Sequence, residues 1–204
     1  MDITSDNNAQ FWDNLAKPCS SYERRSSYAD EFLRKSCILE GESVFDMGCG
    51  SGTLCIPLAD DGHKVFCADF SEKMLQSVRD TVTDEGITLI ETCKLSWQED
   101  WDIRTLPVCD LAIASRCMFD ADPFDTVKKL SNHAKRKVCI TLPVNSSMFK
   151  SPHAKYDVGE QEGRVRYLLE VLNAVFTLGY KPEVSYMTEN DSVKNWAFIS
   201  WDIL

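Results

Sequence analysis

The chain has 204 residues, 44% of them hydrophobic, and a formal net charge of −10. A chain of this length can bury one sizeable core, and no Pro/Gly/Ser-rich linker interrupts it, so a single structural domain is expected. The acidic excess disfavours a nucleic-acid partner, because non-specific affinity for nucleic acid comes mainly from Lys and Arg that neutralise phosphates. No apolar stretch approaches the length of a membrane span and the start of the chain is polar and acidic, so we expect no membrane contact and a cytoplasmic protein.

Two helices are expected before the first strand, over residues 11–16 and 26–38. The second carries Tyr28, Phe32 and Leu33 near helical spacing, which indicates one buried face. We therefore expect residues 1–40 to form a helical extension that packs on a core of residues 41–204.

Strands and helices alternate from residue 43 to residue 142. Ser71 suits the N-cap of a helix, and Phe70 before it is placed to pack on Leu75. The expected strands cover residues 43–47, 64–68, 87–92, 108–114 and 137–142, and the helices between them cover 53–61, 72–85 and 123–133. Alternation of this kind builds a parallel sheet with helices on both faces.

The C-terminal part has a different pattern. A helix is expected over 165–178, closed by Gly179. The apolar runs 183–187 and 196–201 are joined by a segment too short for a crossover helix, so they must pair antiparallel. The whole pattern predicts an α/β, Rossmann-like fold with a seven-stranded, mostly parallel sheet that ends in an antiparallel hairpin.

Three glycines at alternate positions follow the first expected strand: Gly48, Gly50 and Gly52. Glycine allows backbone torsions and a close ligand approach that a Cβ would prevent. Asp69 ends the second strand, where a carboxylate can accept hydrogen bonds from both hydroxyls of a ribose. The turn and the acid together predict a site for a nucleoside cofactor.

The spacing of the glycines selects among such cofactors. A dinucleotide fingerprint has glycines at its first, third and sixth positions, whereas here they occupy the first, third and fifth, and Thr53 takes the sixth. Asp46, two residues before the first glycine, would repel a diphosphate but suits a cationic amino-acid group. An NAD-linked oxidoreductase is therefore a less favoured alternative.

The segment resembles the first motif of the class I S-adenosylmethionine-dependent methyltransferases, acid-x-Gly-x-Gly-x-Gly, and the expected topology resembles theirs over nearly the whole chain. Within that family the chain looks most like small uncharacterised bacterial and archaeal members, with Trp12 in its first helix and Ser115-Arg116 after its fourth strand. The resemblance implies that Asp69 holds the ribose and that the methionine part is lined by Asp46, Gly48, Cys49, Gly50 and Gly52.

Further cofactor contacts are expected beyond the carboxyl ends of the strands. Phe70 can stack on adenine, or serve only to fix the start of its helix. Where the family usually has an acid that binds the adenine amino group, this chain has Ser96 followed by Trp97, which can accept from the amine and cover the ring. Ser115 completes the expected cofactor set.

Arg116 follows the fourth strand, where a guanidinium can clamp a carboxylate or phosphate of a substrate. The alternative is a salt bridge to one of three nearby acids, Asp120, Asp122 or Asp125.

Two tyrosines are also candidate substrate contacts. Tyr22 resembles the aromatic residue that closes over the methionine end in some relatives, or is an interhelical core residue. Tyr156 lies in an irregular stretch, 143–163, that is long enough for a substrate lid, and disorder is equally compatible with its sequence.

Methyl transfer requires little from side chains, because a sulfonium is a good leaving group and in-line positioning supplies most of the rate. No catalytic base is therefore assigned. The nine cysteines contain no C-x-x-C pair and the three histidines form no ligand pattern, so no metal is expected.

The sequence favours a methyltransferase that acts on a small molecule and releases S-adenosylhomocysteine. The alternatives are a cofactor-binding protein without activity and a nucleic-acid or protein methyltransferase; the oligomeric state stays open.

Overall fold

The computed structural model describes residues 5–17, 26–118, 121–144, 160–189 and 193–203. In these residues seven strands form one sheet in the order β3-β2-β1-β4-β5-β7-β6. The strands are β1 (Val44–Met47), β2 (Val65–Asp69), β3 (Ile90–Lys94), β4 (Cys109–Ser115), β5 (Ala134–Pro143), β6 (Glu183–Glu189) and β7 (Val193–Asp202). Six strands run in one direction and β7 alone opposes its neighbours β5 and β6. The expected sheet and its terminal hairpin are confirmed.

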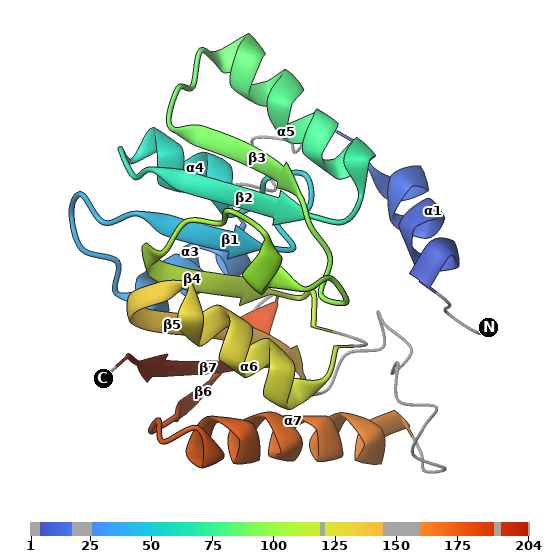
Figure 1. Ribbon diagram of the computed structural model, residues 1–204, viewed down its shortest axis with the longest axis vertical. Coiled ribbons are helices and arrows are strands. Elements are labelled where there is room, and N and C mark those ends of the chain that lie inside the picture. Colours follow the sequence, from blue (N-terminus) through green and yellow to red (C-terminus); the bar gives the residue numbers. More distant parts are fainter. Residues whose placement is uncertain (1–4, 18–25, 119–120, 145–159, 190–192, 204) are drawn as a thin grey trace.

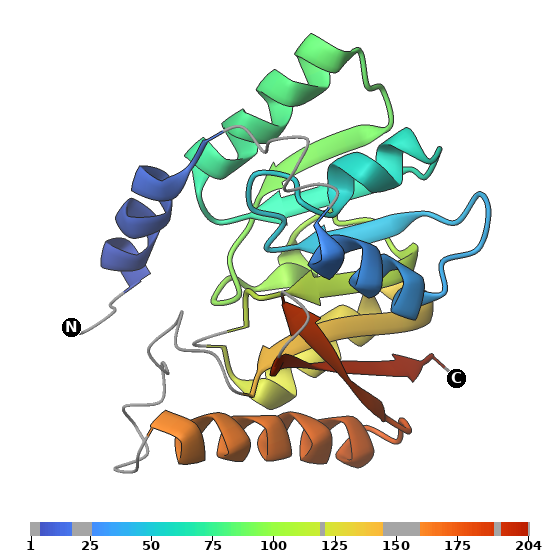
Figure 2. The ribbon, with the colours of Figure 1, turned by 180° about the vertical axis from the view of Figure 1, so that it is seen from behind.

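Helices cover both faces of this sheet (Figures 1 and 2). One core cluster joins the sheet to α3, α4 and α5, and a second joins it to α6 and α7. The helices are α1 (Ser5–Leu15), α3 (Ser27–Ser36), α4 (Cys55–Asp60), α5 (Glu72–Glu85), α6 (Pro123–Asn132) and α7 (Glu160–Thr177), with a short 3-10 turn, η1 (Trp101–Ile103). None of the helices in the described segments combines the length and apolar character needed to cross a bilayer.

The start and stop signals of α5 are where the sequence predicts them. Ser71 accepts a hydrogen bond from the Met74 amide at 3.2 Å, and Gly86 ends the helix with a φ of 70°. Asp122 caps α6 in the same way by accepting from the Asp125 amide at 2.9 Å. Local capping chemistry thus fixes these two helices, because each side chain satisfies an amide that the helix leaves without a partner.

Several boundaries differ from the sequence-based expectation. α1 begins at Ser5 rather than at residue 11, and β7 begins at Val193 rather than at residue 196. β3 begins at Ile90, three residues later than expected, because the Ile87 amide is still bonded to Val82 O at the end of α5. β5 begins earlier, at Ala134, since it continues through the basic residues to pair with β4 and β7. α7 begins at Glu160, five residues before the expected start, and the rest of the irregular stretch, 145–159, lies outside the described residues.

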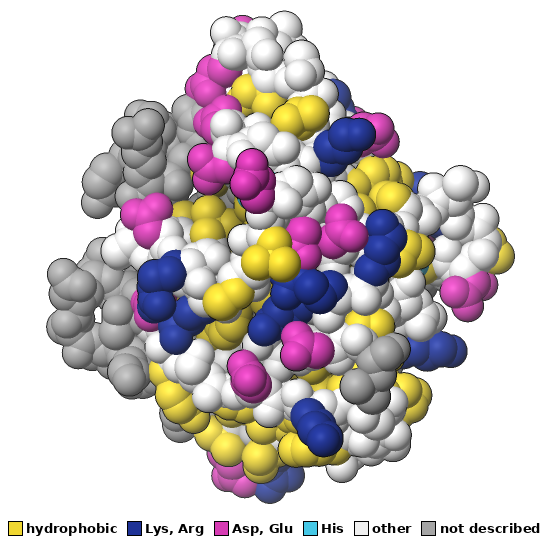
Figure 3. Space-filling view, turned by 90° about the vertical axis from the view of Figure 1, so that its left-hand side faces the viewer, with side chains coloured by type: hydrophobic (Ala, Val, Ile, Leu, Met, Phe, Trp, Pro, Cys, Tyr) yellow, Lys and Arg dark blue, Asp and Glu magenta, His cyan; other side chains and the backbone are white. Residues whose placement is uncertain are grey.

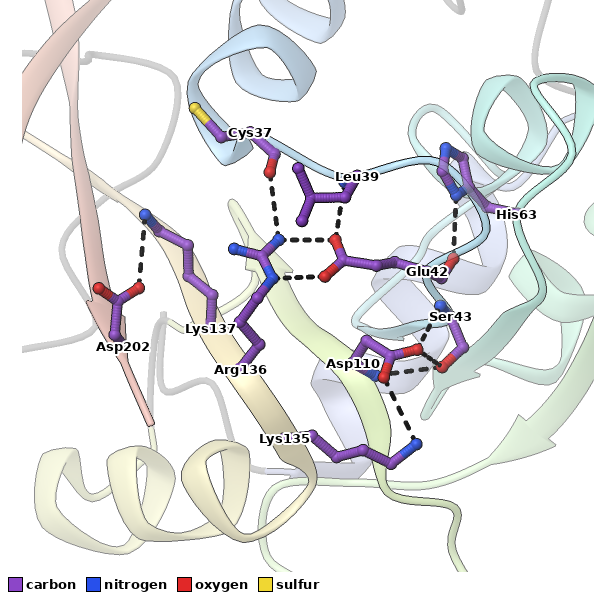
Figure 4. A network of polar contacts seen from close by, with 10 residues as sticks. All are labelled: Cys37, Leu39, Glu42, Ser43, His63, Asp110, Lys135, Arg136, Lys137 and Asp202. Atoms are coloured by element: carbon purple, nitrogen blue, oxygen red, sulfur yellow. Dashed lines mark hydrogen bonds and ion pairs between the residues drawn. The ribbon is translucent and has the colours of Figure 1, made fainter. Parts of the chain in front are cut away.

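Charged side chains of both signs lie close together on the face shown in Figure 3. At the edge of the sheet where the parallel strands begin, a network of polar contacts joins several segments (Figure 4). Glu42 accepts hydrogen bonds from two nitrogens of Arg136 and from the Leu39 amide, and Arg136 also donates to Cys37 O. Ser43 donates to Asp110 Oδ2 through its amide at 2.8 Å and its hydroxyl at 2.6 Å. These contacts join the segment after α3 to β4 and β5.

We predict that Glu42→Gln lowers the free energy of unfolding by about 1–2 kcal/mol, because it removes the charge from a bidentate contact that is largely sheltered from water. Partial burial opposes ionisation of Glu42, but the hydrogen bonds from Arg136 and Leu39 outweigh it and lower its pKa. The stabilisation is therefore present above the unfolded-state pKa of a glutamate and is lost as pH falls through the lower, folded-state pKa.

Urea unfolding at pH 7 measures this effect. Glu72→Gln is the matched control, since Glu72 pairs with Arg79 at 2.5 Å in an exposed position, where an ion pair contributes less than about 0.5 kcal/mol. Equal losses in the two variants would contradict a structural role for the Glu42 contact.

Candidate functional site

The chain turns sharply after β1. Gly48, Gly50 and Gly52 have φ values of 73°, 56° and 104°, a region that residues with a Cβ rarely adopt. The amides of Gly48 and Cys49 both donate to Ala68 O, at 2.7 and 3.1 Å, which holds the turn against the end of β2.

The three glycines serve two different purposes. A Cβ on Gly48 would lie 2.3 Å from Cys117 Cβ, and one on Gly52 would lie 2.4 Å from Ile56 Cδ1, so both positions are needed for packing. A Cβ on Gly50 would meet nothing within 4 Å. Gly50 alone of the three therefore faces open space, as expected where a ligand approaches the backbone.

Asp46 lies inside the sheet just before this turn. It is 1% exposed, and its Oδ2 is buried with no hydrogen-bond partner among the described residues. Burial, together with the charges of Cys55 and Asp69, raises the pKa of Asp46 well above its ordinary value. A buried acceptor without a partner costs about 1–3 kcal/mol, so this atom is suited to receive a donor from outside the chain.

Asp69 ends β2 next to the glycine turn. Its Oδ2 accepts from the Gly50 amide and its Oδ1 from the Ser71 amide, both at 2.9 Å. Burial raises the pKa of Asp69 to about 6, although the hydrogen bonds from Ser71, Gly50 and Phe70 oppose the shift. Between about pH 4 and 6 the folded state thus binds more protons at this site than the unfolded state does, and this site lowers the free energy of unfolding as pH rises through that window.

Helix α1 reaches the same corner of the molecule, on the side toward which β1, β2 and β3 point (Figure 1). Asp13 of α1 accepts a hydrogen bond of 2.5 Å from the hydroxyl of Ser71, the N-cap of α5. Its charge is also one of the groups that raise the pKa of Asp69. The first helix is therefore attached at the margin of the site.

The residues expected near an adenine have different surroundings. Phe70 and Ser96 are partly exposed beyond β2 and β3. Trp97 is buried, stacks on Trp101 with ring centroids 5.3 Å apart, and donates from Nε1 to Cys117 O at 3.1 Å. Trp97 is thus fixed in the core beside the site.

A second cluster lies at the ends of β4 and β5. The Tyr28 hydroxyl is 2.7 Å from Ser115 Oγ and 2.8 Å from Thr141 Oγ1, and the Arg116 amide donates to Thr141 Oγ1 at 3.1 Å. The Arg116 guanidinium lies 4.1 Å from the centroid of the Tyr28 ring and 5.9 Å from that of Trp196. Such cation–π contacts hold the side chain in place beside the hydroxyl cluster.

Arg116 also has a φ of 57°, a left-handed conformation unusual for a residue with a side chain. The turn it makes directs Cys117 onto Gly48, and Cys117 Sγ donates to Met47 O at 3.0 Å. Strained backbone of this kind gathers at functional sites, because the surrounding structure must hold it.

Sequence reasoning found one part of this cluster and missed another. Ser115 and Arg116 were expected at the site, whereas Tyr28 was expected only as a buried helix residue, and Thr141 and Cys117 were given no role. Tyr28, Thr141 and Cys117 reach the site through contacts with residues far away in the sequence, and such contacts leave no pattern in the neighbouring sequence. Tyr22, Asp120 and Tyr156 lie outside the described residues.

Two of the acids considered as partners of Arg116 have other contacts. Asp122 caps α6, and Asp125 pairs with Lys129 at 2.6 Å. No group of His, Cys, Asp and Glu side chains that could hold a metal ion is present in the part of the chain that the structure describes.

We predict that Gly48→Ala lowers the free energy of unfolding by about 3 kcal/mol or more, because the new methyl group meets both Cys117 and a positive φ. Gly86→Ala is the matched control: Gly86 has a φ of 70°, and its Cβ would meet nothing within 4 Å, so we expect a loss of only about 1 kcal/mol. Urea titrations compare the two variants, and similar losses would show that the contact with Cys117 contributes little.

Known proteins share parts of this sequence and this fold. Residues 44–137 match the family model described as a methyltransferase domain. A protein of Haemophilus influenzae described as uncharacterized is 28% identical over 162 residues, which are 79% of this chain and 59% of that protein. The chain thus spans less than two thirds of the length of this relative.

Solved structures show the same fold. A S-adenosylmethionine-dependent methyltransferase from Aquifex aeolicus superposes with a TM-score of 0.68 at 19% identity, covering 96% of this chain and 98% of that one. Magnesium protoporphyrin IX methyltransferase from Synechocystis superposes with a TM-score of 0.60 at 15% identity, covering 97% and 84%. Residues 44–137, which contain the glycine turn, thus match a methyltransferase domain, and the sheet as a whole has the fold of S-adenosylmethionine-dependent methyltransferases.

Proposed function

We propose that this chain binds S-adenosylmethionine at the carboxyl ends of β1 and β2 and transfers its methyl group to a small-molecule acceptor. The observation that carries the proposal is the buried, unpartnered Oδ2 of Asp46 in β1, just before a turn in which a Cβ on Gly50 would meet nothing within 4 Å. An ammonium group supplies both the missing donor and a compensating positive charge, whereas a diphosphate would add negative charge next to two buried carboxylates. When bound, the cofactor supplies a methyl group activated on a sulfonium.

The roles of the other residues follow from their positions. The glycine turn, with Gly48, Cys49, Gly50 and Gly52, borders the methionine part of the cofactor. Asp69 already accepts two amides, and its carboxylate has lone pairs left to accept ribose hydroxyls.

The adenine would lie beyond β2 and β3. Phe70 and Ser96 are partly exposed there, and the buried Trp97 supports the wall behind them. The family's usual acid is absent at this place, so Ser96 would contact the amino group as a neutral acceptor.

The acceptor would bind at the ends of β4 and β5. Arg116 is held on the face of Tyr28, and burial raises the pKa of Tyr28, although the Arg116 charge opposes the shift. The phenol therefore keeps its proton and stays bonded to Ser115 and Thr141. Tyr22 and Tyr156 remain proposed substrate contacts.

We also propose a cytoplasmic location, since the eight cysteines of the described residues are all free thiols, which suit a reducing compartment.

The first test is binding of S-adenosylhomocysteine, measured by calorimetry and by the rise in melting temperature that a ligand of the folded state produces. We expect binding of S-adenosylhomocysteine and none of NAD. Asp69→Ala should weaken the binding of S-adenosylhomocysteine by about 1.5–3 kcal/mol, roughly 10- to 150-fold, because charge-assisted hydrogen bonds to the ribose are lost. Affinity should also fall below about pH 6, where Asp69 becomes protonated.

Circular dichroism of Asp69→Ala separates lost binding from lost folding. Heat release with NAD and none with S-adenosylhomocysteine would refute the cofactor assignment, and unchanged affinity in Asp69→Ala would remove the ribose role.

The second test concerns the acceptor. If Arg116 holds an anionic group of the acceptor, Arg116→Ala should lower methyl transfer at least about tenfold while the affinity for S-adenosylhomocysteine changes less than about twofold, because positioning of the acceptor is lost. Turnover is measured with labelled S-adenosylmethionine on an acceptor found by screening. Arg34→Ala is the control, since the Arg34 side chain is exposed on α3 and pairs with Glu31 at 3.9 Å. Wild-type turnover together with a lowered melting temperature in Arg116→Ala would show a purely structural role.

A further inference from the structure

Apolar side chains form a stripe on the outer side of α7. Val165, Leu169, Leu172 and Phe176 are spaced by four, three and four residues, so they follow one line along the helix. Leu169 is 57% exposed and Phe176 62%, and Leu172 is partly buried against the core. The face of α7 that packs on the protein is separate and contains the buried residues Tyr167, Leu168, Val171, Ala174 and Val175.

The neighbouring edge strand extends this apolar surface. β6 is the last strand of the sheet, and its Val184 and Tyr186 pair with Ile199 and Ala197 of β7, which belong to the core cluster of α7. Paired residues of antiparallel strands point to the same face of a sheet. Val184 and Tyr186 therefore lie on the α7 side, and both are exposed.

This surface, made of the α7 stripe with Val184 and Tyr186, contains five of the eleven exposed large hydrophobic residues in the described parts of the chain. Hydrophobic side chains gather at the lower end of Figure 3, at the level where α7 lies in Figure 1. Contiguous exposed apolar surface of this kind marks an interaction site more often than scattered single residues do.

We propose that a second copy of this chain covers the surface, with the two α7 helices packed antiparallel around a two-fold axis. In a two-fold interface residue i contacts residue j and j contacts i, so the contacting pattern must read the same in both directions. The spacing four, three, four does so. It places Val165 against the partner's Phe176 and Leu169 against the partner's Leu172, and it matches the alternating three- and four-residue spacing of helix pairs that pack side by side.

The charges near the stripe permit such a contact. Glu162 and Arg166 border it and neutralise each other at 2.7 Å. The chain as a whole has a net charge of −10, so two copies repel each other, which costs energy. The paired charges of Glu162 and Arg166 add no net charge to this face.

The size of the surface sets the expected strength. A helix of the length of α7 extends for about 27 Å, and a helix pair with one flanking strand buries roughly 1,000 Å² in total, near the lower limit for a specific interface. We expect a reversible dimer in the micromolar range whose affinity is maintained or increased by salt, because screening weakens the repulsion between acidic copies.

Sedimentation equilibrium of the whole chain, from about 1 to 200 µM, measures the dimer. Leu169→Lys should raise the dissociation constant at least about 100-fold, since it places a charge against an apolar partner. Ile103→Lys is the control: Ile103 is exposed on η1, far from α7 in sequence and on another element, and the substitution adds the same charge. A monomer at 200 µM, or a Leu169→Lys dimer as tight as the wild type, would overturn the proposal.

Cysteine cross-linking tests the antiparallel register. Val165 and Phe176 are about 16 Å apart along one helix, so cysteines at both positions cannot join within a chain. Because Cys37 is an exposed free thiol, all cross-linking variants also contain Cys37→Ser. With diamide as oxidant, the double variant Val165→Cys/Phe176→Cys should form a covalent dimer in excess of the Cys37→Ser parent, and each single variant should not. Single variants that form more covalent dimer than this parent would show a parallel arrangement and contradict the proposed one. None of these measurements involves the cofactor, so the dimer and the proposed function can fail independently.

Discussion

The site depends on one close contact, in which the side chain of Cys117 occupies the space that any residue other than glycine would fill at position 48. This contact locks the turn after β1 to the turn after β4, and Cys117 Sγ reinforces it by donating to Met47 O. The carbonyl of the same cysteine accepts from Trp97, which brings in the loop after β3. Three loops that come from separate strands are thus joined at one residue, and the left-handed conformation of Arg116 is what directs Cys117 there.

The interlocked turns position two buried carboxylates close together. Burial is the main cause that raises the pKa of both side chains, and the charge of Asp69 raises the pKa of Asp46 further. Neither carboxyl group has a cationic partner in its hydrogen-bond contacts among the described residues. Like charges at a shared site destabilise a protein unless a ligand or proton compensates them. Under the proposed function, a cationic ligand would take the place of a proton in compensating these carboxylates. Such a site would favour a positively charged ligand by electrostatics as well as by shape.

Much of this architecture could be predicted from the sequence because the signals are local. The strand, glycine turn and acid occupy a short stretch, and Ser71 and Gly86 mark the ends of α5 through hydrogen bonds to their own neighbours. The start of β3 could not be placed, since Ile87 is apolar in either a strand or a helix end. The contacts of the Tyr28 hydroxyl could not be predicted for another reason. Tyr28 reaches Ser115 and Thr141 across 87 and 113 residues of sequence, and a buried tyrosine on a helix face looks the same whether its hydroxyl binds anything or not.

Tyr28 belongs to the part of α3 that packs on the rest of the fold. Residues 1–40 are expected to form a helical extension that packs on a core of residues 41–204, and Tyr28, Ala29 and Phe32 belong to the same buried cluster as β1, β2 and α4. α3 supplies the phenol that contacts Ser115 at the proposed acceptor side, and α1 supplies the carboxylate that accepts from Ser71, the N-cap of α5, beside Asp69. The boundary near residue 40 is therefore a boundary in sequence pattern, where alternation of strands and helices begins. The proposed site includes residues from both sides of this boundary. α1 contributes to the proposed cofactor side, and α3 contributes to the proposed acceptor side.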